Sequence, residues 1–542
     1  MKYKKILTIA FLILVSFYFF QLWRVAHNYS QSYRFGDEDA HMAGGYLILQ
    51  GLKPYNGFAV NHQPLIYYFS AAVQKIFHPN TLFLFIGRHR EAIFAYSIFW
   101  NILYLIIFGP IIFFFTAIFE IMRYVMLGNK VLGESLAVYP LAMLFGLAIK
   151  RLIFDKRLLT PEIIISSLSS FIAAFTLLPI WPAIFILNLM IFIANRKNRK
   201  ELILQVASLI IPTIILFLFV PLKDYFRETF YYNYKYVIPN MNLDKYKFPE
   251  SYIRMVLLPF AAIKNHPNFM EVAAAIFLFL YAVILYRLRH TKKIWPFLTI
   301  IFALVLTNNR VYEIKPGNFH LLPWLGAYFF IPIVFIAQSF HCSINKKAKI
   351  TEVGEKRYQA FMLAILFALA IWLNFFSRSD YYGNILLNLH NNIESEHYIN
   401  YADSVKYGLG IKAVMAPGDR LIGLPNDELV FWVAGANLAT KPLENYDWQY
   451  NIPRYNKELY DVFANNPPEF YLATELNPLS AKSPLDYFIL KNLDNKYVRV
   501  NHLGHTSNLY ILKTKLPKIT PDQWKTFKYL LFEKPTVTIF NQ

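Results

Sequence analysis

Long runs of apolar residues, separated by short polar and basic stretches, fill the first two thirds of this chain. The first run covers residues 6–23, with bulky Phe20 and Trp23 where a signal peptide would have a small-residue cleavage site. Later runs lie at about 92–118, 134–149, 160–195, 203–221, 272–286, 294–307, 321–340 and 359–376. Because a bilayer-crossing helix needs about 20 mainly apolar residues, the pattern predicts a mainly α-helical, polytopic membrane protein with a retained first span.

Three basic clusters orient the predicted spans. They lie at residues 196–200, 287–293 and 346–357, and loops on the cytoplasmic side of membranes are enriched in Lys and Arg. Two membrane crossings fit between each pair of successive basic clusters, and one more crossing follows the last cluster. This arrangement predicts nine spans, a cytoplasmic N-terminus and an external C-terminus.

An alternative count gives eleven spans. The second and fourth apolar runs are longer than one span needs, with Pro110 inside one and Pro179 and Pro182 inside the other. If both runs fold back as hairpins, the loop at 150–162 becomes cytoplasmic, whereas nine spans place it outside. Both alternatives leave the two termini on the same sides.

The first external loop covers residues 24–91. Within it, 40–51 and 65–77 have mixed apolar and polar faces, which favours short helices along the membrane surface. A second external loop at 222–267 is rich in Tyr, which is typical of an aromatic belt at the membrane interface. A shorter external loop covers 308–320.

The chain changes character near residue 378, where membrane-length apolar runs end. We expect a transmembrane module at 1–377 and an external α/β domain at 378–542, because short strands alternate there with helices. The predicted strands are 421–424, 470–473, 497–500 and 509–512, and the predicted helices lie near 396–408, 456–465, 484–493 and 521–532.

Composition narrows the function classes. The 542 residues are 56% hydrophobic and only 16% charged, with a formal net charge of +20. The positive-inside bias accounts for this basic excess, so we expect no nucleic-acid partner. The single cysteine, Cys342, excludes an intrachain disulfide and the thiolate sets of zinc cages and iron–sulfur clusters.

Three consecutive acids, Asp37, Glu38 and Asp39, follow the first span closely. Acids at such a position stabilise the start of a helix, since they pair with free amides and suit the helix dipole. A carboxylate facing a cavity could instead accept a proton from an attacking hydroxyl, or hold a divalent metal cation against a phosphate. The two interpretations stay open, with Asp37 and Glu38 as candidates for catalysis and for metal binding.

Glu162 opens a later apolar run, after Thr160 and Pro161, as in an ordinary helix start. In the nine-span topology it lies on the same side as Asp37, where it would be a second catalytic acid. Other side chains on the predicted external side could contact a sugar or a lipid phosphate: Lys53, His62, Arg88, Arg310, Lys315 and His320.

Several motifs resemble GT-C glycosyltransferases, in particular the branch of protein O-mannosyltransferases and the lipid A aminoarabinose transferase. The acidic pair Asp37-Glu38, the turn Pro54-Tyr55 and the run from His62 to Tyr67 are similar to that family's first external loop. The segment Arg157–Glu162 resembles the stretch where the family has a second acid, which favours nine spans. The sequence departs from the family around 160–195, where it has Leu-Leu-Pro-Ile-Trp-Pro.

The resemblance implies a GT-C-type helical bundle with a C-terminal external α/β domain in the plasma (inner) membrane. It implies inverting transfer of a sugar from a polyprenyl-phosphate donor to a lipid, glycan or protein acceptor on the outer face. Asp37 would be the general base or a carboxylate that orients the acceptor, Glu38 would support it or share a metal, and Tyr55 would contact substrate.

Two other function classes remain as alternatives. A polytopic transporter or lipid flippase usually shows internal repeats and charges at the bilayer midplane, and we find no clear repeat. An assembly subunit that binds a partner through its C-terminal domain would tolerate replacement of the acids.

Overall fold

The computed structural model divides the chain into two compact units. The first contains Met1–Asn28, Arg90–Leu216 and Lys245–Asn391, and the second contains Tyr29–His89, Phe217–Asp244 and Asn392–Gln542. The structure describes residues 2–240, 253, 256–263, 268–308, 314, 317–345, 352–376, 392–423, 428–444, 449, 451–472, 484–502 and 505–533.

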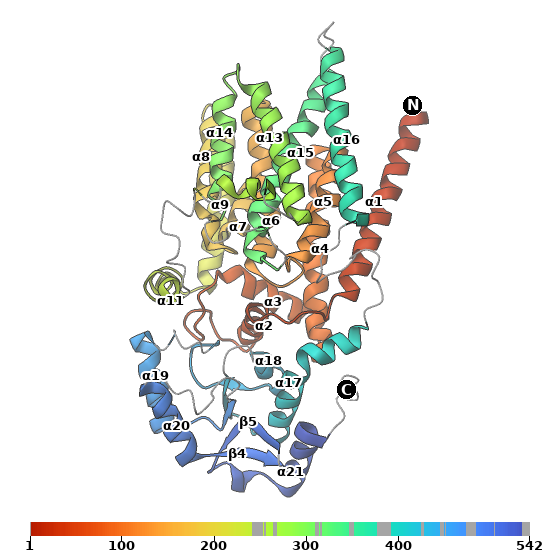
Figure 1. Cartoon of the computed structure of the whole chain (residues 1–542). Helices are drawn as coiled ribbons and strands as arrows, with labels where there is room; N and C mark the ends of the chain where they lie inside the picture. Colours follow the sequence, from red (N-terminus) through yellow and green to blue (C-terminus); the bar gives the residue numbers. More distant parts are fainter. Residues whose placement is uncertain are drawn as a thin grey trace. The chain divides into compact units, whose positions relative to one another are not determined.

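The first unit is a bundle of apolar helices, drawn in Figure 1. Among the described residues, seven helices are long and apolar enough to cross a membrane, and Thr160–Ala174, Ile294–Val305 and Ala360–Trp372 are shorter apolar helices. This finding confirms the predicted polytopic helical class. The bundle's helices are α1 (Lys2–Asn28), α4 (Leu82–Phe108), α5 (Phe113–Val125), α6 (Gly133–Ala148), α7 (Thr160–Ala174), α8 (Trp181–Asn195), α9 (Arg199–Phe219), α13 (Phe269–Leu288), α14 (Ile294–Val305), α15 (Leu322–Asn345) and α16 (Glu352–Phe376).

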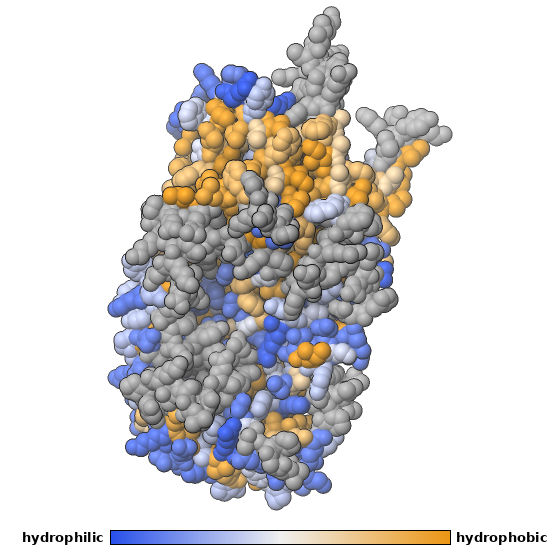
Figure 2. All heavy atoms as spheres, in the orientation of Figure 1, coloured by the Kyte–Doolittle hydropathy of each residue, from blue (hydrophilic) through white to orange (hydrophobic). Residues whose placement is uncertain are grey.

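The bundle has a buried centre and an apolar exterior. Helices α6 and α15 pack against each other and are almost completely buried. Side chains such as Ile106, Phe185 and Ile203 are exposed instead, and Figure 2 shows apolar residues over the helices with hydrophilic ones at their end. An exterior of this kind is expected of helices that face lipid.

Each of the two longest apolar runs is broken into two helices. After Gly109, whose φ is +89°, the turn Pro110–Ile112 separates α4 from α5, and the side chains of Asn101 and Glu120 meet at 2.8 Å across the resulting pair. The turn Leu178–Ile180 separates α7 from α8 in the same way. Proline lacks a backbone N–H and restricts the residue before it, which explains why the breaks fall at Pro110 and Pro179.

These breaks correct the predicted side of the 150–162 loop. Arg151 Nε donates to Asn195 Oδ1 at 2.8 Å, and Arg157 Nε donates to Glu201. Lys293 Nζ donates to the backbone oxygen of Leu152 at 3.2 Å. The loop therefore lies at the same end of the bundle as the basic clusters at 196–200 and 287–293. The nine-span prediction placed it at the opposite end, and that placement is wrong.

The second unit combines segments that are far apart in sequence. It joins the C-terminal residues to 29–89 and to 217–244, both of which the predicted boundary at 377 assigned to the membrane module. Helices are present at both predicted places, as α2 (Gly36–Leu49) and α3 (Pro64–Phe77), and α2 packs against α18 (Leu429–Ala434). The backbone N–H of Ala59 also donates to the oxygen of Lys441 at 2.7 Å.

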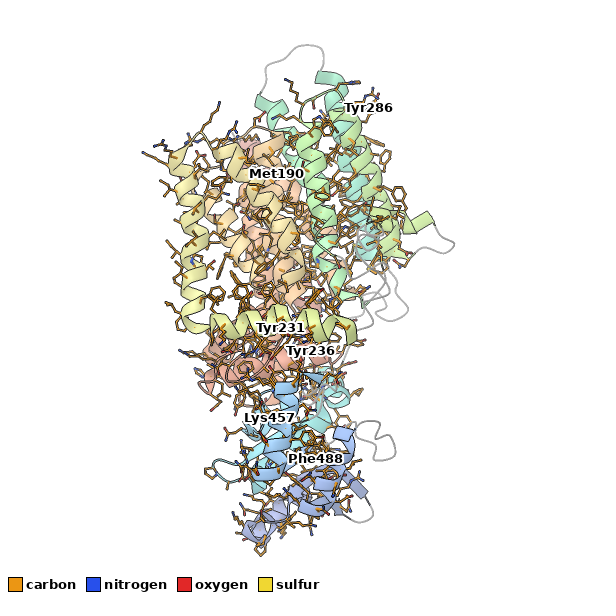
Figure 3. The ribbon with its side chains drawn as sticks, turned by 90° about the vertical axis from the view of Figure 1, so that its left-hand side faces the viewer. Met190, Tyr231, Tyr236, Tyr286, Lys457 and Phe488 are labelled. Carbon is orange, nitrogen blue, oxygen red and sulfur yellow. The ribbon has the colours of Figure 1, made fainter. Side chains whose placement is uncertain are left out.

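The Tyr-rich segment of this unit forms the helix α10 (Leu222–Phe226) and the π-helix η4 (Arg227–Val237). Its tyrosines divide into two groups, since Tyr225 is fully buried while Tyr231 is half exposed. Tyr231 and Tyr236 are labelled on this helix in Figure 3, and the ammonium of Lys235 lies 5.4 Å from each ring centroid.

The C-terminal segment forms the predicted α/β domain around a five-stranded sheet with strand order β2-β1-β3-β5-β4. Strand β1 pairs in parallel with β2 and β3, whereas β5 runs antiparallel to both β3 and β4. The strands are β1 (Arg420–Gly423), β2 (Asn437–Leu438), β3 (Phe470–Leu472), β4 (Tyr497–His502) and β5 (His505–Leu512), and the helices are α17 (Ile393–Val414), α18, α19 (Pro453–Asn465), α20 (Pro484–Lys496) and α21 (Pro521–Lys528).

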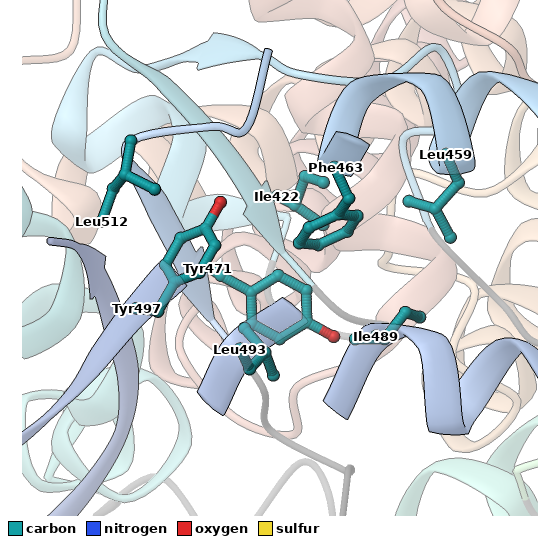
Figure 4. Packing of buried hydrophobic residues seen from close by; sticks show 8 residues of the cluster. All are labelled: Ile422, Leu459, Phe463, Tyr471, Ile489, Leu493, Tyr497 and Leu512. Atoms are coloured by element: carbon teal, nitrogen blue, oxygen red, sulfur yellow. The ribbon is translucent and has the colours of Figure 1, made fainter. Parts of the chain in front are cut away.

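An aromatic and aliphatic core holds α19 and α20 against this sheet. Phe463 of α19, Leu493 of α20 and Tyr471 of β3 are each at most 2% exposed and belong to one cluster, shown in Figure 4. The hydroxyl of Tyr497 donates to the backbone oxygen of Pro468 at 2.7 Å, so this buried phenol has a hydrogen-bond partner.

Candidate functional site

The three consecutive acids at the start of α2 have different environments. Asp37 is partly exposed, while the side chains of Glu38 and Asp39 are fully buried. The guanidinium Nε of Arg34 donates to Asp39 Oδ2 at 2.6 Å, which gives Asp39 a buried ion pair. Asp37 is thus the acid of this group that remains accessible to solvent.

The helix dipole favours all three acids, because each lies in the first turn of α2. The residue before the helix, Phe35, contributes no side-chain cap. Successive residues of a helix project about 100° apart, so Asp37 and the buried Glu38 do not face one point. In the described part of the chain, no group of three or more His, Cys, Asp or Glu residues could hold a metal ion.

Helix α3 and the loop before it bring aromatic and imidazole groups to α2. The hydroxyl of Tyr55 donates to the backbone oxygen of His62 at 2.7 Å, and Nδ1 of His62 lies 3.2 Å from Nε2 of His41. The ring of Tyr67 meets His41 edge to face, with centroids 5.5 Å apart. These contacts hold His62 in place from both its backbone and its ring.

A glycine in α2 allows this close approach. A Cβ at Gly44 would lie 2.4 Å from Cδ1 of Tyr67, which is far inside van der Waals contact. The absence of a side chain at Gly44 therefore lets the Tyr67 ring lie directly against α2.

Tyr55 itself is buried in the protein. Its side chain is 0% exposed, and its φ of +69° is rare for a residue other than glycine. Burial, with the neighbouring Tyr225 as a smaller cause, raises the pKa of the Tyr55 phenol well above its usual value. The structure thus gives Tyr55 a structural contact with the His62 backbone.

An acid that the sequence did not single out joins this group. Glu444 is only 3% exposed, and burial together with the Asp37 carboxylate raises its pKa to about 8. Because Ala59 and Lys441 are hydrogen-bonded, the 441–444 segment lies beside the loop that leads into α3. No motif or characteristic spacing marks Glu444 in the sequence.

The phenol of Tyr67 interacts electrostatically with both of these acids. Burial raises its pKa well above the usual value, and the charges of Glu444 and Asp37 raise it further. Tyr67 is 0% exposed, and its hydroxyl has no hydrogen-bond partner among the described residues. Asp37, Tyr67 and Glu444 therefore form a polar group to which α2, α3 and the 441–444 segment each contribute one side chain.

The other residues predicted for the site have varied environments. Lys53 is exposed, and the Arg88 guanidinium lies 5.7 Å from the Phe77 ring centroid. His320 belongs to the first unit, where its Nδ1 lies 2.6 Å from Glu134 Oε1. Arg310 and Lys315 lie outside the described residues.

Glu162 also belongs to the first unit. It accepts hydrogen bonds from the Lys150 ammonium and, at 3.0 Å, from the Leu159 backbone N–H, which caps the start of α7. Glu162 thus caps a helix and forms an ion pair, as a structural acid does. It lies at the end of the bundle where the basic clusters are. We therefore do not assign it to the site.

Comparison with known proteins shows a structural likeness without a sequence match. No family model and no curated protein matches the chain. The crystal structure of ArnT from Cupriavidus metallidurans bound to undecaprenyl phosphate is similar, with a TM-score of 0.54 and 11% sequence identity. The match covers 92% of this chain and 98% of that chain. The chain therefore shares the overall fold of that ArnT structure.

Proposed function

We propose that this protein is a membrane glycosyltransferase that moves a sugar from a polyprenyl-phosphate donor to an acceptor on the outer face of the membrane. The fold supports the donor class, because the similar ArnT structure contains undecaprenyl phosphate. The observation that carries the proposal is the position of Asp37, a partly exposed carboxylate beside Tyr67 and the buried acid Glu444.

The reaction needs one base. An acceptor hydroxyl attacks the anomeric carbon as the bond from that carbon to the phosphate oxygen breaks, and the proton of the hydroxyl passes to Asp37. The lipid phosphate leaves as a stable anion, so it needs no acid at neutral pH. Attack from the face opposite the phosphate inverts the configuration. A positioned base of this kind contributes roughly 10²–10⁴-fold to the rate.

The donor phosphate requires positive groups or hydrogen-bond donors. In this proposal Lys53, His62 and Arg88, which all belong to the second unit, supply them. Lys53 is exposed, so its ammonium is accessible to a donor phosphate. The contacts to Tyr55 and His41 fix the position of His62.

A divalent cation would find its ligands in Asp37 and the donor phosphate. Magnesium is commonly bound through one or two carboxylates plus substrate phosphates, and Asp37 fits this role better than the buried Glu38. When bound, such an ion would neutralise charge on the phosphate that leaves. Loss of transfer after chelation, with recovery on adding Mg²⁺ or Mn²⁺, would establish the requirement.

The proposal is tested by transfer of labelled sugar from polyprenyl-phosphate donors to a membrane extract. We expect Asp37→Asn to slow transfer roughly 10²–10⁴-fold without changing the amount of folded protein. Asp403→Asn is the matched control, because Asp403 is an exposed acid on α17 and the same chemical change there should leave transfer intact. Full transfer by Asp37→Asn would remove Asp37 from the mechanism. Wild-type protein that neither binds nor uses any donor would favour the transporter class.

A further inference from the structure

A groove lies between helix α21 and strand β4 in the second unit. Its volume is about 1050 Å³, at the upper end of the range for small-molecule sites in proteins, about 300–1,000 Å³. Residues of both elements line it, and Figure 1 shows α21 and β4 near each other. Asp37, Tyr67 and Glu444 do not line this groove, so it is separate from the candidate active site.

One wall of the groove carries aromatic side chains. Trp524 on α21 is partly exposed, and Tyr529, which follows the helix, is 46% exposed. The Trp524 ring meets the fully buried Phe527 ring edge to face, with centroids 5.2 Å apart. Because Trp and Tyr combine an apolar ring with a polar tip, they suit the apolar C–H faces and polar edges of a sugar ring. This wall therefore provides surfaces on which sugar rings can stack.

Basic side chains line the groove on both sides. Lys525 and Lys528 of α21 are exposed and three residues apart, so they are neighbours on the helix surface. Arg499 comes from β4 on the other side, and Asp522 and Glu533 are the two acids in the lining. Three cations and two acids give the lining a net charge of +1. None of the three cations forms an ion pair with a described residue, so all three remain to bind an anion.

Arg499 is held in place by its own hairpin. Its Nε donates to the backbone oxygen of Ser507 at 2.7 Å, and its Nη2 donates to Asn508 Oδ1 at 3.3 Å. The guanidinium carbon lies 5.8 Å from the centroid of the Tyr510 ring. Its Nη1 makes no hydrogen bond within the part of the chain that the structure describes. A guanidinium fixed in this way loses little side-chain entropy when Nη1 binds an anion.

The groove belongs to a basic stretch of the chain. Residues 491–533 contain eight Lys or Arg and three Asp or Glu, which gives a net charge of +5. The positive-inside bias acts on basic residues within about 15–20 residues of span ends, and this stretch begins far beyond the last apolar helix, which ends at Phe376. The bias therefore does not account for this local excess. A negatively charged ligand of this stretch would account for it.

We propose that the groove between α21 and β4 binds an anionic saccharide, a sugar chain that carries carboxylate, sulfate or phosphate groups. Trp524 and Tyr529 stack against sugar rings, while Arg499, Lys525 and Lys528 pair with the anionic groups. A membrane surface is too flat to enter a groove, and an acidic peptide offers no sugar ring to the aromatic wall. This binding does not depend on the transfer reaction proposed for Asp37.

Binding of acidic oligosaccharides tests this proposal. Full-length protein in phosphatidylcholine nanodiscs would be titrated by calorimetry with oligogalacturonate and with a sulfated oligosaccharide, each beside its uncharged counterpart (the methyl ester or the unsulfated chain). We expect at least one acidic compound to bind, with an affinity that falls as salt is added, because salt screens exposed charges. Its uncharged counterpart keeps the sugar rings but should bind more weakly.

Two pairs of lysines separate the groove from the rest of the basic stretch. Lys525→Gln combined with Lys528→Gln should weaken binding of the acidic compound roughly five- to tenfold, because two exposed charge pairs are lost. Lys513→Gln combined with Lys518→Gln is the control, since both lysines are exposed and neither lines the groove. Trp524→Leu should weaken binding of the acidic compound and of its uncharged counterpart by the same factor. A Tm equal to that of wild type shows that a variant is folded.

Several results would overturn the saccharide site. Wild-type protein that binds neither acidic compound, or that binds the uncharged counterparts equally well, has no such site. Equal binding by the two double-lysine variants would remove the groove from the interaction. Tighter binding of polyglutamate or of phosphatidylglycerol vesicles through Lys525 and Lys528 would assign the groove to an acidic peptide or to a lipid surface instead. Because none of these measurements involves sugar transfer, their results stand whether or not the glycosyltransferase proposal holds.

Discussion

Replacing Glu444 by glutamine should change how the protein's stability depends on pH. The carboxyl has a pKa of about 8 when folded, against an ordinary value of 4.5. A group whose pKa is raised by folding contributes its full stability below the ordinary pKa and loses it as the pH rises toward the folded one. The wild-type protein should therefore become less stable from about pH 4.5 to pH 8, and Glu444→Gln should lack this decline.

The size of the effect follows from the shift. One pKa unit corresponds to about 1.4 kcal/mol, so the free energy of unfolding should fall by roughly that amount per pH unit within this window. Between pH 5 and pH 7 the loss at Glu444 comes to roughly 2.5 kcal/mol. For the second unit, which has about 240 residues, this corresponds to a change in Tm of roughly 5 °C or more.

Thermal unfolding followed by tryptophan fluorescence measures this difference. Wild type, Glu444→Gln and the exposed-acid control Asp403→Asn would be compared in the same detergent at pH 5, 6 and 7. We expect the variant to gain in Tm over wild type as the pH rises, while Asp403→Asn stays parallel to wild type. Parallel curves for wild type and Glu444→Gln would show that Glu444 ionises normally in the folded protein and would refute the reasoning.

Three further substitutions test other parts of the account. Arg34→Ala should destabilise the protein by about 3 kcal/mol, because the fully buried Asp39 loses the ion pair at 2.6 Å, and chemical denaturation measures the loss. Gly44→Ala should lower the free energy of unfolding by about 1–3 kcal/mol and reduce transfer, since the new methyl group would displace Tyr67. Measurements of Tm and of transfer on the same variant detect the two effects. Glu162→Gln should lower Tm while leaving transfer intact, and a selective loss of transfer would return Glu162 to the site.

Local patterns predicted the helices and strands well. Apolar run length identified the membrane helices, and mixed polar faces identified α2 and α3. Strands β1, β3, β4 and β5 were predicted within a few residues, whereas the two-residue β2 and the short α18 were missed. Elements this short bury too little to leave a periodic signal, so their positions depend on the neighbours they pack against.

Tertiary contacts determined what the sequence could not predict. Glu444 reaches Asp37 and Tyr67 because the 441–444 segment pairs with Ala59, far away in the chain. No sequence pattern around Glu444 predicts the pairing of this segment with Ala59. The 150–162 loop was misplaced because a family resemblance at Arg157–Glu162 was given more weight than the four basic residues of that loop. Its contacts to Glu201 and Asn195 agree with the charge pattern instead.

The central claim is that Asp37 performs the chemistry while other groups bind the donor. Purified protein should be mixed in excess with a labelled polyprenyl-phosphate sugar and an acceptor-containing membrane extract, with donor binding and a single round of transfer measured separately. The account predicts that Asp37→Asn binds the donor with nearly wild-type Kd and transfers its sugar roughly 10²–10⁴-fold more slowly. A variant that transfers at the wild-type rate, or that loses donor binding and transfer in equal measure, would contradict it.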